Sequence, residues 1–244
     1  MNLSRAVEAA RFQSPLPVRL ASLSAYILLL WIGLPCFSPT VWRALLPSHS
    51  SQAVAPHVAA ASLPAWFGLC VVYLVESIFA SVGWVSLHSW KPREVIVHHL
   101  SVVAGSAAIV CTFIASPAQF LDFVEEHPPM VAITGASIFT CFNEAFFVLR
   151  SLLPPVLADA PQTCRASSAI TLTVLLVQIP LHLVACTRSC YLIATGAHAG
   201  FAAWKRASIA TNMVACIGFV LIVQMSYLRP NLRRVLGWSR NKQG

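Results

Sequence analysis

The most constraining feature of the sequence is a series of apolar runs, each about as long as a bilayer core is thick. About 20 residues of helix cross such a core, where unpaired backbone polar groups are too costly to leave exposed. Six runs of this kind occupy residues 20–37, 63–87, 95–116, 130–149, 168–195 and 207–228. Their apolar residues are continuous rather than alternating, so the runs predict helices.

The charge content points the same way. Asp, Glu, Lys and Arg make up 10% of the 244 residues, whereas a soluble domain carries roughly 25%. So few charges cannot cover a water-facing surface, and the apolar excess must face lipid. The sequence predicts an all-α integral membrane protein with about six transmembrane helices. Its parts are an N-terminal segment at 1–19, one transmembrane domain at 20–228 and a basic tail at 229–244.

The distribution of basic residues predicts the orientation. With six spans, twelve of the 16 Lys and Arg residues fall on the side that holds both termini. The other side holds four, and its loop between the third and fourth spans is acidic. Because cytosolic loops carry the excess of Lys and Arg, both termini are expected in the cytosol. The assignment of Arg188 depends on where the fifth span ends. The net charge of +8 then reflects topology and contact with anionic lipid rather than nucleic-acid binding.

Five ionisable side chains within the runs stand out, since such groups are rare within membranes because they are costly there. They are Glu76, His98, His99, Glu144 and His182. At a rise of 1.5 Å per residue, His98 lies roughly 6 Å and Glu144 roughly 9 Å from the cytosolic ends of their spans. Consecutive spans joined by a short loop usually pack side by side. We therefore expect Glu144 and one of the two histidines to face a shared cavity near the cytosolic side.

The remaining two groups are expected elsewhere. Glu76 should lie near the middle of the second span, where it pairs with a polar neighbour such as Tyr73 or with a residue of a partner helix. His182 should lie deep in the fifth span, two residues after the kink expected at Pro180. Both are interpreted as intramembrane polar residues rather than as catalytic groups.

Two segments resemble the TLC-domain family of membrane proteins. REVIVHHLSVVAG, residues 93–105, resembles the family's paired histidine at the start of a span. FNEAFFVLRSLL, residues 142–153, resembles its next landmark, an acidic residue followed by Phe and Arg at the cytosolic end of a span. The ceramide synthases of this family carry Asp residues in the span that follows the histidines, whereas the fourth run here has none. The resemblance is therefore to the smaller TLC-domain proteins.

The resemblance implies a multi-pass protein of the endoplasmic reticulum that acts in sphingolipid or phospholipid homeostasis. The corresponding enzyme hypothesis is transfer of an acyl group from acyl-CoA to a lipid. Of the paired residues His98 and His99, one supplies a general base and the other orients it, while Glu144 fixes an imidazole tautomer. Lys91 or Arg150 would bind the CoA phosphates. Membrane lipids are the expected partners, acyl-CoA is the co-substrate, and no resident cofactor or metal is expected.

Three alternatives remain open. The histidines can be structural hydrogen-bonding groups in a non-catalytic regulator of membrane lipid composition. The protein can be a helper in membrane cargo handling or translocation. The weakest alternative is a metal-dependent lipid hydrolase in which zinc is held by residues near the cytosolic face, namely His88, His98, His99 and Glu144.

Overall fold

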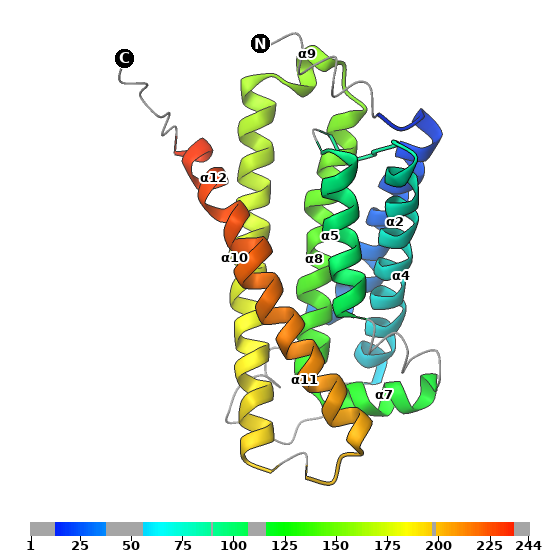
Figure 1. Ribbon diagram of the computed structural model, residues 1–244, viewed down its shortest axis with the longest axis vertical. Helices are drawn as coiled ribbons and strands as arrows, with labels where there is room; N and C mark the ends of the chain where they lie inside the picture. Colours follow the sequence, from blue (N-terminus) through cyan, green and yellow to red (C-terminus); the bar gives the residue numbers. More distant parts are fainter. Residues whose placement is uncertain (1–12, 38–55, 89, 107–115, 197–198, 237–244) are drawn as a thin grey trace.

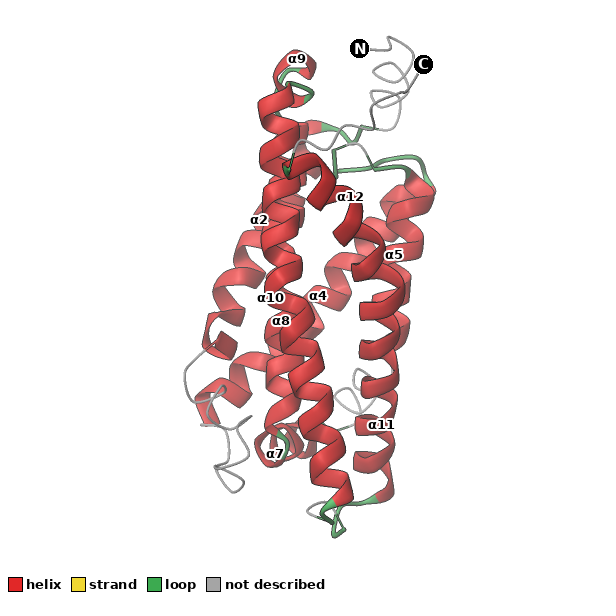
Figure 2. Cartoon of the chain, turned by 90° about the vertical axis from the view of Figure 1, so that its left-hand side faces the viewer, coloured by secondary structure: helices red, strands yellow, loops and turns green. Residues whose placement is uncertain are grey.

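The computed structural model describes residues 13–37, 56–88, 90–106, 116–196 and 199–236. Within these ranges the chain is helical, and its one β-type pairing is an isolated bridge between Gln13 and Val85. Most of the helices stand side by side in a bundle, with α7 lying across one end and α9 at the other (Figures 1 and 2). The helices are α2 (Leu16–Gly33), α4 (Pro56–Ser81), α5 (Pro92–Gly105), α7 (Pro117–Glu126), α8 (Pro128–Ser151), α9 (Pro155–Ala158), α10 (Pro161–Ala194), α11 (Ala203–Gly218) and α12 (Met225–Val235).

Five stretches of helix are long and apolar enough to cross a membrane. They are Leu16–Phe37, Ala60–Ser81, Pro128–Ser151, Pro161–Ala194 and Ala203–Val235. Large apolar side chains point outward from several of them, among them Trp31, Ile78, Val214 and Ile222, which are 64% to 75% exposed. An outer surface of this kind suits lipid rather than water. The chain is thus a helical, multi-pass membrane protein.

The third predicted span is described only in part. Helix α5 has 14 residues, fewer than the roughly 20 that cross a bilayer core. Residues 107–115, which complete the predicted run, lie outside the described part of the chain. The structure thus supports five spans by length and composition, and the count of six stays a prediction.

Two boundaries differ from those expected. Helix α10 is one helix of 34 residues, so Arg188 lies inside it and is buried rather than lying in a loop. Its guanidinium carbon stands 4.9 Å from the centre of the Tyr191 ring. Helix α12 continues to Val235, beyond the predicted end of the last span at residue 228.

Prolines mark where several helices begin. Pro92, Pro128 and Pro161 are the first residues of α5, α8 and α10. Proline suits this position because the first helical N–H groups have no partner within the helix. At the start of α5 the backbone N–H of Lys91 also donates to Glu94 Oε2 at 2.9 Å. This start places the two adjacent histidines on the second turn of α5.

Helix α8 is the centre of the bundle. It packs against α2, α4 and α10, while α5 packs mainly on α4. Small residues bring these helices close. A Cβ atom on Gly33 of α2 would lie only 2.6 Å from Ile138 Cγ2 of α8, a close approach that glycine allows in membrane bundles. Polar residues of α8 are thereby enclosed among α2, α4, α5 and α10.

The described chain starts and finishes at the same end of the bundle. Helix α2 begins and helix α12 ends toward the end that carries α9, opposite α7 (Figure 1). We refer to these two ends as the α9 end and the α7 end. The turns that carry Lys91, Arg93 and Arg150 lie at the α9 end, while Asp122, Glu125 and Glu126 belong to α7. The basic and acidic ends are therefore opposite ends of the bundle.

Candidate functional site

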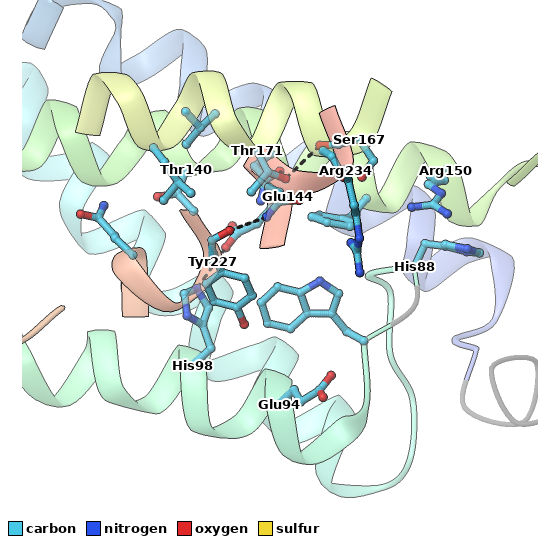
Figure 3. A pocket seen from close by; sticks show the side chains of 18 of the residues that line it. His88, Glu94, His98, Thr140, Glu144, Arg150, Ser167, Thr171, Tyr227 and Arg234 are labelled. Atoms are coloured by element: carbon cyan, nitrogen blue, oxygen red, sulfur yellow. Dashed lines mark hydrogen bonds and ion pairs between the residues drawn. The ribbon is translucent and has the colours of Figure 1, made fainter. Parts of the chain in front are cut away.

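A cavity of about 600 Å³ extends from the α9 end into the bundle. It is formed by α5, α8, α10 and α12, together with the loop before α5 and the turn after α9. Figure 3 shows His88 and Arg150 toward one end of this cavity and His98 and Thr140 toward the other. Many of its lining side chains are polar, including Asn143, Ser167, Thr171, Gln178 and Gln224. A polar chamber of this size within a membrane bundle suits a ligand with polar groups.

The inner part of this cavity reaches the paired histidines and Glu144. His98 Nε2 lies 3.6 Å from Glu144 Oε1, and His99 Nε2 lies 4.0 Å from the same oxygen. The predicted proximity of Glu144 to the histidines is thus confirmed. His98 and Glu144 line the cavity, whereas His99 lies behind them and is fully buried. The catalytic roles assigned to these residues stay predictions.

Tyr73 of α4 holds this cluster in place. Its hydroxyl donates to Glu144 Oε1 at 2.6 Å, and its ring stacks on the His99 ring with centroids 4.1 Å apart. Of the two partners predicted for Glu76, Tyr73 bonds Glu144 instead, while a residue of a partner helix, Tyr26 of α2, does bond Glu76. One tyrosine therefore fixes both a carboxylate from α8 and an imidazole from α5.

Glu76 joins the cluster from the other side. Its Oε2 lies 3.6 Å from His99 Nδ1 and accepts a 2.5 Å hydrogen bond from the Tyr26 hydroxyl of α2. Glu76 was expected near the middle of its span, but α4 ends at Ser81, only five residues later. Glu76 is therefore level with the histidines and belongs to the site.

Several polar atoms of the cluster are buried without a hydrogen-bond partner among the described residues. They are His98 Nδ1, both ring nitrogens of His99, Glu76 Oε1 and Glu144 Oε2. Buried polar groups are almost always paired, because each unpaired one costs about 1–3 kcal/mol. These unpaired atoms leave donor and acceptor positions of the cluster open to water, an ion or a ligand.

At the outer end of the cavity, Arg150 contacts residues on both sides of the turn after α9. Its Nε donates to the Ala158 carbonyl at 2.7 Å, and its Nη2 lies 3.5 Å from Asp159 Oδ1 and 3.2 Å from Cys164 Sγ. The Arg150 side chain is buried by these contacts. Arg150 thus fastens the turn around α9 to the end of α8, which leaves little of its guanidinium for a phosphate.

His88 joins the contacts that Arg150 makes around α9, which we call the latch, and it lies apart from the His98 cluster. Its Nε2 lies 3.0 Å from Asp159 Oδ1. Burial lowers the pKa of His88, and the nearby positive charge of Arg150 lowers it further, although the hydrogen bond with Asp159 opposes both. The four-residue zinc set that included His88 is therefore wrong, because His88 does not join the other three.

The cations near the cavity differ from those expected. Lys91 is exposed and does not line the cavity in the described structure. Arg234, in the last turn of α12, is exposed and does line it (Figure 3). The sequence indicated Arg234 only as part of a basic tail, and nothing in the local pattern showed that α12 would carry it to the cavity.

A smaller and more apolar slot, of about 60 Å³, adjoins the cavity deeper in the bundle. The two spaces share Thr140 and Phe219 in their linings. His182 lines this slot rather than the larger cavity, with its ring edge-on to Phe219 at 6.1 Å. The remaining lining mixes apolar side chains with small polar ones, namely Trp66, Leu69, Val102, Ile133, Ala215 and Cys216 with Tyr73, Ser101, Ser106, Ser137 and Asn212.

Two buried glutamines that the sequence analysis did not single out also lie at the inner cavity. Gln178 Nε2 donates to the Ala136 carbonyl at 2.7 Å, and Gln224 Nε2 donates to Gln178 Oε1 at 2.9 Å. Gln224 ends a π-helical stretch, Phe219–Gln224, that joins α11 to α12. Such stretches are frequent at functional sites. Uncharged polar residues within the apolar runs were the available signal for this pair.

Comparison of the chain with protein-family models, curated proteins and solved structures finds no match in any of the three. The chemistry of the site is therefore inferred from its own residues and their geometry.

Proposed function

We propose that this protein is a TLC-domain-like enzyme of lipid homeostasis that transfers an acyl group from acyl-CoA to an amine or hydroxyl of a membrane lipid. The observation that carries the proposal is a polar cavity that leads from the basic end of the bundle to His98 and Glu144 and there adjoins an apolar slot. An acyl thioester has the matching shape, with a polar head, a reactive carbonyl and an apolar chain.

The lining supports this placement of the substrate. Arg234 at the outer end of the cavity suits a phosphate of CoA, since guanidinium groups bind phosphate through paired hydrogen bonds. The apolar slot suits part of the acyl chain. The two spaces meet at Thr140 and Phe219, and the Phe219 ring lies 6.0 Å from the His98 ring. The thioester carbonyl would thus lie beside His98.

His98 is the proposed general base. Its Nε2 takes a proton from the lipid amine or hydroxyl as that group bonds to the thioester carbonyl carbon. The carbon–sulfur bond then breaks, and the CoA thiolate receives the proton from the imidazolium. Glu144, 3.6 Å from Nε2, stabilises the imidazolium while it exists. Tyr73 and His99 hold Glu144 and position the pair.

The proposed location follows from the charges and the resemblance. The basic α9 end faces the cytosol by the positive-inside rule, and acyl-CoA would enter the cavity from there. The endoplasmic reticulum is the proposed organelle because the two landmark segments resemble those of TLC-domain proteins, for which that location is typical.

Untargeted lipidomics on cells that lack the protein tests this function. We expect one class of acylated lipid to fall and its unacylated precursor to rise, and re-expression of the wild-type chain should restore both. Re-expression of His98→Ala at equal abundance should restore neither. A broad shift in acyl-chain saturation, corrected equally by His98→Ala, would instead favour the non-catalytic regulator.

A further inference from the structure

We propose that His98, His99 and Glu144 bind a divalent transition-metal ion, for which Zn²⁺ is the closest chemical fit. One ligand atom from each of the three lies within 4.8 Å of the others. Two imidazoles and one carboxylate form a donor set used by zinc enzymes, with a fourth position left open. Magnesium and calcium prefer oxygen ligands alone, so they suit this set less well. The inference stands on this geometry and does not rest on the acyl-transfer function.

The unpaired atoms of the cluster are the second observation. His99 is fully buried, and neither of its ring nitrogens has a hydrogen-bond partner among the described residues. Glu144 is 1% exposed, and its Oε2 is likewise unpaired there. A cation bound between them would satisfy a nitrogen of His99 and an oxygen of Glu144 together. It would thereby remove the cost of leaving these atoms unpaired inside a membrane protein.

The surroundings resemble the outer shell of a metal site. A metal-bound histidine usually directs its other ring nitrogen toward a carboxylate, which sets the tautomer and the ring orientation. His99 directs Nε2 toward Glu144 and Nδ1 toward Glu76, 3.6 Å away. Glu76 is held by Tyr26. Tyr73 occupies Oε1 of Glu144, so Oε2 remains available as a ligand.

Charge balance supports a divalent ion. Two carboxylates, Glu76 and Glu144, are buried beside two imidazoles. Buried carboxylates in a membrane interior are costly unless a positive charge accompanies them. A doubly charged ion between the histidines and Glu144 would offset whatever negative charge the two carboxylates carry.

The distances allow an ion after a small contraction. With zinc–ligand bonds of about 2.0–2.1 Å, the ligand atoms of a tetrahedral site lie about 3.4 Å apart. One ligand atom from each of the three residues lies within 4.8 Å of the others, so side-chain rotations that shorten these separations by up to about 1.4 Å would complete the site. His98 and Glu144 also line the large cavity, which gives the ion an entry path and directs the open fourth position toward the cavity.

Metal binding has a direct consequence for the proposed chemistry. An ion bound by His98 Nε2 uses the lone pair that the general base needs. The same molecule therefore cannot use that nitrogen for both purposes, and Zn²⁺ would inhibit an enzyme that depends on the free base.

The test is metal content of the full-length protein, purified, treated with a chelator and reconstituted in lipid nanodiscs. After titration with Zn²⁺, we expect the wild type to bind about one more zinc ion per chain than Glu144→Gln or His99→Phe. His99→Phe keeps a ring that can stack on Tyr73, and Glu144→Gln keeps an oxygen that can accept from the Tyr73 hydroxyl. Both variants therefore preserve the main contact of the replaced side chain with Tyr73. Equal zinc content in all three proteins would overturn the proposal and assign the ion to other groups, such as the cysteines.

Two further measurements on the wild type test the metal site even if a variant folds poorly. Co²⁺ added to the wild type should give visible absorption bands of a nitrogen- and oxygen-ligated ion, and Zn²⁺ should raise its melting temperature. Glu94→Gln, a carboxylate of the same cavity outside the cluster, is the matched control and should retain the ion. Absence of both wild-type signals would overturn the proposal without reference to any variant.

The activity of the same samples separates this proposal from the acyltransferase function. Inhibition of acyl transfer by zinc, reversed by the chelator, supports both the metal site and the free base. Activity that is lost with the chelator and restored by zinc supports the metal site but contradicts His98 as the base. Zinc binding to a protein that cleaves no acyl-CoA supports the metal site while the proposed function fails.

Discussion

At the scale of single residues, the site depends on how its two buried carboxylates are held. Each accepts a hydrogen bond from a tyrosine hydroxyl, Glu144 from Tyr73 and Glu76 from Tyr26. His99 lies between the two carboxylates, 4.0 Å from one and 3.6 Å from the other. The two tyrosine–glutamate pairs therefore hold His99 from both sides. Glu144, which also faces His98, is held by Tyr73.

Replacement of Tyr73 by Phe tests this arrangement. Tyr73→Phe keeps the ring that stacks on His99 but removes the hydrogen bond to Glu144. A buried acceptor that loses its partner costs about 1–3 kcal/mol, so the melting temperature of the purified protein should fall. Tyr26→Phe should produce a similar loss through Glu76. Unchanged melting temperatures in both variants would mean that these hydroxyls do not stabilise the carboxylates.

At the scale of elements, the sequence predicted the positions of most helices but not all of their ends. The apolar runs located the helices that cross the bundle. The end of α4 was missed because apolar residues continue beyond it, including Trp84, Val85 and Leu87. Gly83 has φ of +87°, a left-handed conformation that ends the helix, and Val85 and Leu87 are buried from a loop. Hydropathy does not distinguish a buried loop from a continued helix.

This error also determined what could be predicted of the site. Depth counting along α5 and α8 brought Glu144 to the histidines, because both helices start or end near a clear boundary. The same counting misplaced Glu76, since it used the wrong end of α4. The contacts of Arg150 around α9 and the position of Arg234 at the cavity were not predicted, for a related reason. The path of the chain around α9 and the direction of α12 depend on tertiary packing, which the local pattern does not contain.

The latch around α9 yields a prediction of pH dependence. Burial and Arg150 lower the pKa of His88 below its ordinary value of 6.5, so the folded state resists protonation that the unfolded chain accepts. The stability that His88 contributes is present above about pH 6.5 and is lost as the pH falls through the lowered pKa. The melting temperature should thus decrease from pH 7.5 to pH 5, and His88→Gln should show a smaller decrease. Identical pH profiles would exclude His88 as the responsible group.

At the scale of the whole molecule, the basic and acidic ends define an orientation. Helix α2 begins and helix α12 ends at the α9 end (Figure 1), as an even number of spans requires. Arg188 no longer belongs to an external loop, which only increases the imbalance of basic residues between the two ends. By the positive-inside rule we expect the α9 end, and with it the entrance of the cavity, to face the cytosol.

Epitope tags on the two termini test this orientation. After selective permeabilisation of the plasma membrane, antibodies should reach tags at both residue 1 and residue 244. Access to only one tag would mean an odd number of spans, and protection of both would mean the opposite orientation. A tag within residues 197–198, between α10 and α11, should stay protected and serves as the internal control.

The central claim is that the cavity leads to a catalytic His98, and acyl transfer by the purified protein tests it most directly. The chain in nanodiscs is supplied with acyl-CoA and a panel of lipid amines and alcohols, and CoA release and acylated lipid are measured together. We predict that one acceptor class is acylated and that His98→Ala lowers its turnover by about 100-fold or more, the scale of a general-base contribution. The variant should still elute as a folded, monodisperse protein. Equal turnover by folded His98→Ala, or no transfer to any acceptor by the wild type, would contradict the claim.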